Sequence, residues 1–274
     1  MGIKIYSFER LNHSFFCTII LREVAMNIEE YLEKKLKLKK GKGKEILNCI
    51  SSFKKEKNQN RLKKISIPNY SLGEEIFNSV SHGIGAIFGV VALVLMIVKA
   101  SGALAETCVS LFGSTMIILY TISCIYHALS SHLLGKKVLR VIDHCNVYLL
   151  VFGTYIPMSL MGIGGSEGWV FFGVVGFITL IGIVLSCIDI ERFQVLEVVC
   201  HLGNGWAALF AIPALLNTIG KMGLFYLILG GVFYSVGSIL YGIGKHKKYM
   251  HSVFHIFCLL GTISHFITIY FYLI

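Results

Sequence analysis

The chain has 274 residues, of which 55% are hydrophobic and only 15% are charged, and its mean hydropathy is +0.72. Because an average soluble domain carries about 25% charged residues, this composition excludes a soluble globular protein and indicates a multi-pass protein of the cell membrane. The net charge of +10 is concentrated near the N-terminus, where residues 1–75 hold 16 of the 25 Lys and Arg against nine of the 15 Asp and Glu.

The N-terminal region, residues 1–72, is predicted to be a basic cytoplasmic tail that is partly disordered or amphipathic. Its apolar run at 13–21 is shorter than the ~20 residues that span a bilayer, and no small-residue cleavage site follows it. Residues 1–25 are either an upstream extension or a loosely attached amphipathic piece, since Met26 opens a more ordinary beginning. The Lys-rich stretch 27–65 favours anionic membrane lipids, and without interleaved aromatic residues it predicts no nucleic-acid partner.

The remainder, residues 73–274, is predicted to be an all-α membrane domain of seven helices that carries a metal site. A turn-rich linker precedes it, and each of its apolar segments is near the ~20 residues that a spanning helix needs. Pro157 and Pro213 fall inside two of them and are expected to kink them. The segments run over residues 76–98, 105–129, 141–162, 168–188, 196–216, 222–243 and 251–273.

The loop charges predict the orientation, because cytoplasmic loops carry the excess of Lys and Arg. One side has only Lys99 and Lys221. The tail and the three loops of the other side should therefore be cytoplasmic and the C-terminus external. The basic residues of those three loops are Lys136, Lys137, Arg140, Arg192, Lys245, Lys247 and Lys248.

This topology places polar residues of four separate helices at one depth, near the cytoplasmic face. Ionisable residues inside a membrane usually face the protein interior and mark a functional site. The agreement of four helices is stronger evidence than any one motif. The residues are Glu75, Asn78 and His82, then Ser123 and His127, then Asp143 and His144, and finally His251 and His255.

Three histidines of this level predict a zinc site. His251 and His255 are four residues apart and share one helix face, and His127 supplies a third nitrogen. Three protein ligands with an open fourth position are typical of a catalytic zinc, and three imidazoles suit that metal. Zinc lowers the pKa of a bound water to about 7.

Two further residues are candidates for catalysis. Asp143 can take a proton from the water and later pass it to a leaving group. Ser123 lies one turn before His127 and can hydrogen-bond the water or the substrate carbonyl. Each has a simpler interpretation: Asp143 forms an interfacial ion pair with Arg140, and Ser123 bonds its own helix backbone.

The remaining polar residues of the membrane domain have supporting or structural interpretations. Glu75, Asn78 and His82 share one helical stripe and are predicted to support the ligands from behind. His201 could lie near the site. His265 is about 15 Å beyond His255, too deep for a ligand, and is interpreted as a packing or hydrogen-bonding residue. The cysteines, mostly in apolar runs without a C-x-x-C pair, are interpreted as small hydrophobic residues.

The order and spacing of these residues resemble the hemolysin III branch of the progestin and adipoQ receptor family. The motifs are Glu75-x-x-Asn78-x-x-x-His82, Ser123-x-x-x-His127, Asp143-His144 and His251-x-x-x-His255, with His265 ten residues later. The resemblance covers about residues 72–274 and leaves residues 1–65 without a counterpart. It implies seven helices with a cytoplasmic N-terminus, a zinc held by the three histidines, and Asp143 and Ser123 near its water.

Relatives in that family include adiponectin receptors and alkaline ceramidases, so the resemblance implies a hydrolase of a lipid amide such as a ceramide. Two alternatives stay open. One is a pore-forming cytolysin, which the family name implies for some bacterial members. The other is a receptor-like protein of membrane homeostasis in which the zinc is structural.

Overall fold

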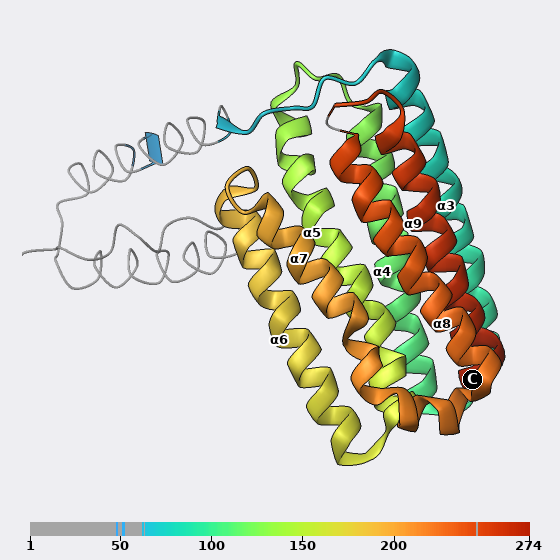
Figure 1. Cartoon of the computed structure of the whole chain (residues 1–274). Helices are drawn as coiled ribbons and strands as arrows, with labels where there is room; N and C mark the ends of the chain where they lie inside the picture. Colours follow the sequence, from blue (N-terminus) through green and yellow to red (C-terminus); the bar gives the residue numbers. More distant parts are fainter. Residues whose placement is uncertain (1–47, 49–50, 53–61, 63, 245) are drawn as a thin grey trace, which may run out of the picture.

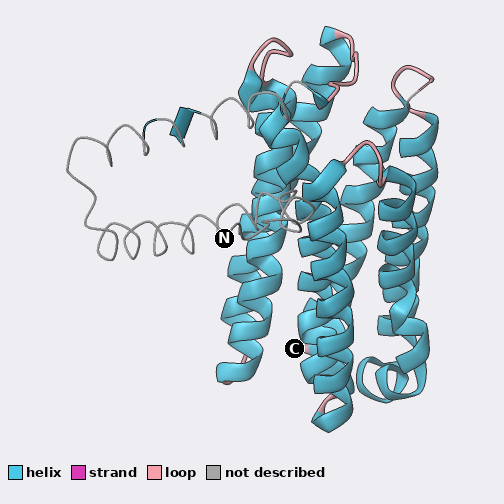
Figure 2. Ribbon diagram, turned by 90° about the vertical axis from the view of Figure 1, so that its left-hand side faces the viewer, coloured by secondary structure: helices cyan, strands magenta, loops and turns pink. Residues whose placement is uncertain are grey.

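The computed structural model describes residues 48, 51–52, 62, 64–244 and 246–274. Within this part of the chain the long elements are all helices, and they run roughly parallel in one bundle (Figures 1 and 2). Six of them are long and apolar enough to cross a membrane, which confirms the all-α membrane class. The predicted tail, residues 1–72, lies mostly outside the described residues, and the predicted extension, residues 1–25, lies wholly outside them.

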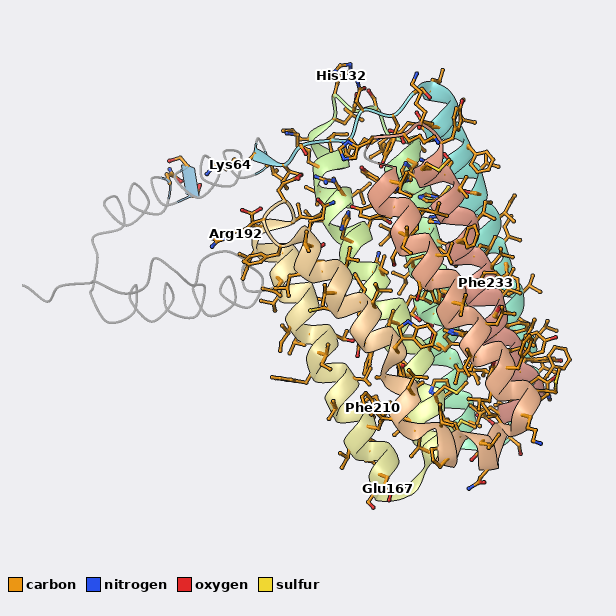
Figure 3. All side chains as sticks on the ribbon, in the orientation of Figure 1. Lys64, His132, Glu167, Arg192, Phe210 and Phe233 are labelled. Atoms are coloured by element: carbon orange, nitrogen blue, oxygen red, sulfur yellow. The ribbon has the colours of Figure 1, made fainter. Side chains whose placement is uncertain are left out.

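The long helices include short turns of other helical types. In chain order the elements are α3 (Leu72–Lys99), α4 (Ala103–Ala128), α5 (Leu134–Pro157), the π-helix η1 (Met158–Ile163), α6 (Gly165–Asp189), α7 (Gln194–Gly205), the 3-10 helix η2 (Trp206–Ala211), α8 (Ile212–Ile243), α9 (Met250–Ile267) and the π-helix η3 (Thr268–Leu273). The loops 129–133 and 190–193, which carry His132 and Arg192, lie toward the end of the bundle opposite Glu167 (Figure 3).

One apolar stretch, Gln194–Ile243, contains 50 residues and takes in two of the predicted segments. A straight helix of that length would be about 75 Å long, against a hydrocarbon core of about 30 Å. Gly220 interrupts it with φ 66° and ψ −179°, a conformation that glycine adopts readily. The chain descends along α7 and returns along α8 (Figure 1). The two predicted segments form one stretch because Gly220 is the one residue of α8 with non-helical backbone angles, and the 3-10 helix η2 continues α7 into α8 without a loop.

The two prolines predicted to kink helices both mark a change of helical type. Pro157 is the last residue of α5, and the π-helix η1 follows it. Pro213 is in the first turn of α8, directly after the 3-10 helix η2. Proline is well tolerated in a first turn because its missing N–H would have no intrahelical partner there.

A single carboxylate joins the beginnings of α3 and α9. Ser71 and Glu74 form a capping box at the start of α3, in which the Ser71 backbone N–H donates to Oε2 of Glu74 at 2.9 Å. The other oxygen, Oε1, accepts the backbone N–H of Tyr249 at 2.7 Å. Tyr249 has a left-handed φ of 62° and immediately precedes α9. The polar ends of these two helices are thus held together.

Candidate metal centre

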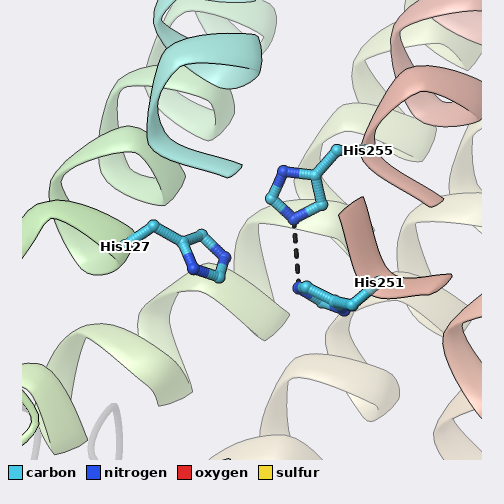
Figure 4. A group of neighbouring side chains, drawn as sticks. All are labelled: His127, His251 and His255. Atoms are coloured by element: carbon cyan, nitrogen blue, oxygen red, sulfur yellow. Dashed lines mark hydrogen bonds between the residues drawn. The ribbon is translucent and has the colours of Figure 1, made fainter. Parts of the chain in front are cut away.

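The three predicted histidines meet at one point between α4 and α9. His127 is in the last turn of α4, and His251 and His255 are in the first turns of α9. One ring nitrogen from each lies within 4.8 Å of the others, and their rings face one another (Figure 4). The three residues are buried, with 2%, 8% and 1% of their surfaces exposed in chain order. Residues more than 120 positions apart along the sequence therefore form one cluster.

The donor set fits a metal ion. The Nε2 atoms of His251 and His255 are 3.1 Å apart, and two nitrogens on one tetrahedral zinc lie about 3.3 Å apart. Nε2 of His127 is buried without a hydrogen-bond partner among the described residues, as expected of a nitrogen meant for a metal. The nitrogens of the set lie within 4.8 Å of one another. Bringing the most distant pair to the spacing of two nitrogens on one zinc therefore takes a movement of at most about 1.5 Å.

Glu75 orients His127 from behind. Its Oε2 lies 2.6 Å from Nδ1 of His127, which leaves Nε2 directed at the cluster. A carboxylate on the far nitrogen of a ligand histidine fixes its tautomer and its ring orientation. Asn78, on the same face of α3, is fully buried and has its amide nitrogen 3.5 Å from the same Nδ1.

Lys136 balances the charge of Glu75. Its ammonium group lies 2.5 Å from Oε1 of Glu75 and donates to the Leu129 carbonyl at 2.8 Å, and the residue is only 1% exposed. The assignment of Lys136 to a loop is therefore wrong. The reason is that α5 begins at Leu134, which turns this side chain back into the bundle.

Two aromatic contacts pack the imidazoles. His82 stacks on His255, with ring centroids 3.6 Å apart and planes 15° apart, so it contacts the cluster by stacking and not by a hydrogen bond. Tyr70, in the linker before α3, stacks on His251 at 4.9 Å and 19°. Burial, followed by neighbouring tyrosines, raises the pKa of the Tyr70 phenol. Sequence reasoning missed Tyr70, because nothing in a turn-rich linker signals that one side chain covers the site.

Asp143 and Ser123 lie next to each other beside the cluster. Ser123 is 1% exposed, and its side chain is close enough to the carboxylate of Asp143 to favour its charged form. His127 is close enough to act on that carboxylate electrostatically. The alternative ion pair between Asp143 and Arg140 is not formed.

Arg140 instead pairs with Glu191 and donates to the Ser66 carbonyl at 2.6 Å. Partial burial opposes ionisation of Glu191, but the hydrogen bonds from Arg140 and Ser66 outweigh it and lower the pKa of this carboxyl. Arg140 is 4% exposed and lies inside α5, so its assignment to a loop is also wrong. Together these contacts fasten the linker across the polar end of the bundle.

A cavity of about 160 Å³ extends from His251, one histidine of the cluster, into the membrane domain between α5, α7, α8 and α9. Its polar end includes Asp143, His144, Glu197 and His251, and its deeper walls are mostly apolar. Glu197, in α7, is 2% exposed and had no place in the sequence-based site. It was missed because it stands near the predicted start of an apolar segment, where a carboxylate is ordinary.

The two other membrane histidines line this cavity without joining the cluster. His201 stacks on Tyr148, with centroids 3.5 Å apart. Nε2 of His265 lies 3.2 Å from the Leu227 carbonyl, which confirms its interpretation as a hydrogen-bonding residue. No disulfide joins the cysteines of the described part of the chain.

Comparison with known proteins assigns the family. A family model described as Haemolysin-III related matches residues 70–266. The chain belongs to this family. Hemolysin-3 of Bacillus cereus is 32% identical over 204 residues, which cover 73% of this chain and 92% of the relative. A Hemolysin-3 homolog of Bacillus subtilis (strain 168) is 34% identical over 206 residues, which cover 74% and 96%.

Membership of the Haemolysin-III related family confirms the resemblance seen in the sequence. With six helices of spanning length and composition, this family member is a multi-pass membrane protein. The family match includes every predicted site residue and begins at Tyr70, so it takes in the aromatic ring that stacks on His251. Residues 1–69 lie outside it.

Proposed function

We propose that this Haemolysin-III related protein is a zinc-dependent hydrolase that cleaves a lipid amide of the ceramide type inside the membrane. One observation carries the proposal: three buried imidazoles converge, and one of them, His251, lines a mostly apolar cavity that also has Asp143 in its wall. A zinc ion held by the three histidines would supply a water that ionises near neutral pH.

The protein's own groups have complementary roles in this proposal. Asp143 accepts the proton of the attacking water, and Ser123 keeps its carboxylate in place. Glu75 holds His127 with Nε2 toward the metal. The mostly apolar cavity follows α5 from Asp143 to Tyr155, about 18 Å at 1.5 Å per residue, and it takes the acyl chain.

Metal analysis combined with turnover tests the proposal. Purified protein in nanodiscs should contain one zinc per chain and hydrolyse a long-chain ceramide, and His251→Ala should lose both properties. His265→Ala is the matched control, because it removes a buried histidine of the same helix outside the cluster and should retain the zinc. A wild-type protein without zinc, or full turnover in His127→Ala, would contradict the proposal.

We also propose seven crossings, a cytoplasmic N-terminus and an external C-terminus. The break at Gly220 within a stretch too long for one crossing supports the seventh, and the basic loops support the orientation. An epitope at the C-terminus should be cut by protease added to intact cells. Protection of that epitope until the cells are lysed would overturn the orientation.

The name Hemolysin-3 of the relatives favours a second candidate, a membrane-lysing protein. The two functions separate in one experiment. Purified protein is added to erythrocytes as wild type and with all three cluster histidines replaced by alanine. Lysis that survives the triple replacement would support a cytolysin, and an absence of lysis together with amide turnover would support the hydrolase.

A further inference from the structure

A second pair of ionisable side chains lies in the cavity wall, apart from the three-histidine cluster. Nδ1 of His144, in α5, is 3.3 Å from Oε2 of Glu197, in α7. The Glu197 side chain is 3% exposed, and its Oε1 has no hydrogen-bond partner in the described chain. The His144 side chain is 18% exposed, and both residues line the cavity. The carboxylate therefore stands behind the imidazole.

This arrangement leaves one nitrogen of His144 available. A carboxylate that accepts the Nδ1–H of a histidine fixes its tautomer and orientation, and Nε2 is then free for acid–base chemistry. The turn that carries Glu197 is itself held, because the Tyr148 hydroxyl donates to the Glu197 backbone carbonyl at 3.1 Å. A buried ionisable group in a membrane domain is costly and usually serves the site.

We propose that His144 donates the proton that the leaving nitrogen needs during amide cleavage, and that Glu197 is the residue that positions it. This inference rests on the proposed hydrolase function and assigns its second proton transfer. Asp143 takes one proton from the attacking water, whose oxygen bonds to the carbonyl carbon. Asp143 passes this proton through solvent to Nε2 of His144, which becomes an imidazolium. The C–N bond then breaks, its electron pair stays on nitrogen, and that nitrogen takes the proton from Nε2 of His144.

Asp143 is then again a carboxylate and His144 again neutral, so each turnover consumes one amide and one water and yields one carboxylic acid and one amine. The neighbouring position of Asp143 and His144 in the same cavity wall suits this proton transfer. Proton donation of this kind contributes about 10²–10⁴ in rate, and it matters most when the leaving group is a strongly basic amine.

The test compares two substrates that share one acyl chain, using the zinc-loaded full chain in nanodiscs. One is an N-alkyl amide, whose nitrogen must be protonated to leave, and the other is a p-nitrophenyl ester, whose leaving group departs as an anion. For the amide, kcat should fall about 100-fold in His144→Gln and about 10- to 100-fold in Glu197→Gln. Ester turnover should change less than about threefold, and both variants should keep their zinc.

His201→Gln is the matched control, because His201 lines the same cavity without a carboxylate partner among the described residues. It should leave the ratio of the two rates unchanged. Equal losses on both substrates in His144→Gln, or no loss on the amide, would overturn the proton-donor role. A wild-type protein that cleaves neither substrate would refute the hydrolase function itself, which makes the two failures distinguishable.

A second measurement needs no turnover. In ¹⁵N-histidine spectra of the zinc-loaded protein, the His144 signal is identified by its absence in His144→Gln. It should report a proton on Nδ1 in the wild type and a mixture of tautomers in Glu197→Gln. A wild-type His144 with its proton on Nε2 would overturn the positioning role of Glu197.

Discussion

Replacing Glu75 with glutamine should separate two effects of one carboxylate. In the structure, one oxygen of Glu75 lies 2.6 Å from His127 and the other 2.5 Å from Lys136. The substitution keeps the shape of the side chain and removes its charge. The Lys136 ammonium then stays buried without a counter-ion, and His127 loses the acceptor that orients its ring.

The expected magnitudes follow from the burial of the partners. Stranding one member of a buried ion pair costs about 3–5 kcal/mol. Because the Glu75 side chain is 16% exposed and Lys136 is 1% exposed, we expect the lower figure, about 3 kcal/mol. Losing the carboxylate behind a ligand should weaken zinc binding about 10- to 100-fold. The pair Glu75→Gln/Lys136→Met should regain most of the stability but none of the zinc affinity.

Thermal unfolding of chelator-treated protein in detergent measures the stability, and titration against a competing chelator measures the zinc affinity. Recovery in the double variant should be incomplete, since Lys136→Met also leaves the Leu129 carbonyl without its 2.8 Å hydrogen bond. The reasoning is refuted if the double variant unfolds at the same temperature as Glu75→Gln, or if Glu75→Gln binds zinc as tightly as the wild type does.

Three further outcomes are expected from thermal unfolding. Gly182→Ala should destabilise the protein, because the added Cβ would lie 2.2 Å from the Tyr148 ring. Gly173→Ala, in the same helix, meets nothing within 4 Å and should gain up to about 1 kcal/mol of helix propensity. Equal effects of the two substitutions would contradict the packing of α5 on α6. The pKa of Glu191 is lowered from 4.5, so the stability contributed by its charge should be fully present above pH 4.5 and be lost as the pH falls through the lowered pKa. A stability difference between wild type and Glu191→Gln that stays constant with pH would count against the Arg140 contact. Removing zinc should lower the unfolding temperature, since a ligand present at 100 times its Kd stabilises by about 2.7 kcal/mol; an unchanged temperature would argue against a bound ion.

The convergence of the cluster could be predicted because helix order and loop charge assign each histidine a depth. That argument needs only the ends of the helices, and His127, His251 and His255 meet as it requires. The depth of a residue in the membrane does not indicate whether its side chain points back into the bundle. Lys136 was therefore assigned to a loop, although it lies in the first turn of α5 and is buried beside Glu75.

Contacts between distant segments without a shared pattern could not be predicted either. Tyr70 reaches His251 from a linker that has no periodicity to analyse. Glu197 and His144 come from different helices, and their contact depends on how α7 packs against α5. Nothing in the sequence spacing of either residue indicates how α7 is rotated about its axis relative to α5.

The Glu74 bridge has a consequence for how this protein tolerates change in length. Glu74 accepts the backbone N–H of Tyr249, two residues before His251. This contact fixes the position of α9 along α3, and it lies after the loop that joins α8 to α9. Residues added to or removed from 244–248 would change the length of that loop, whereas His251 and His255 would keep their position along the bundle beside Glu75. One residue inserted between Tyr249 and His251 would instead rotate α9 by about 100° and scatter the nitrogens.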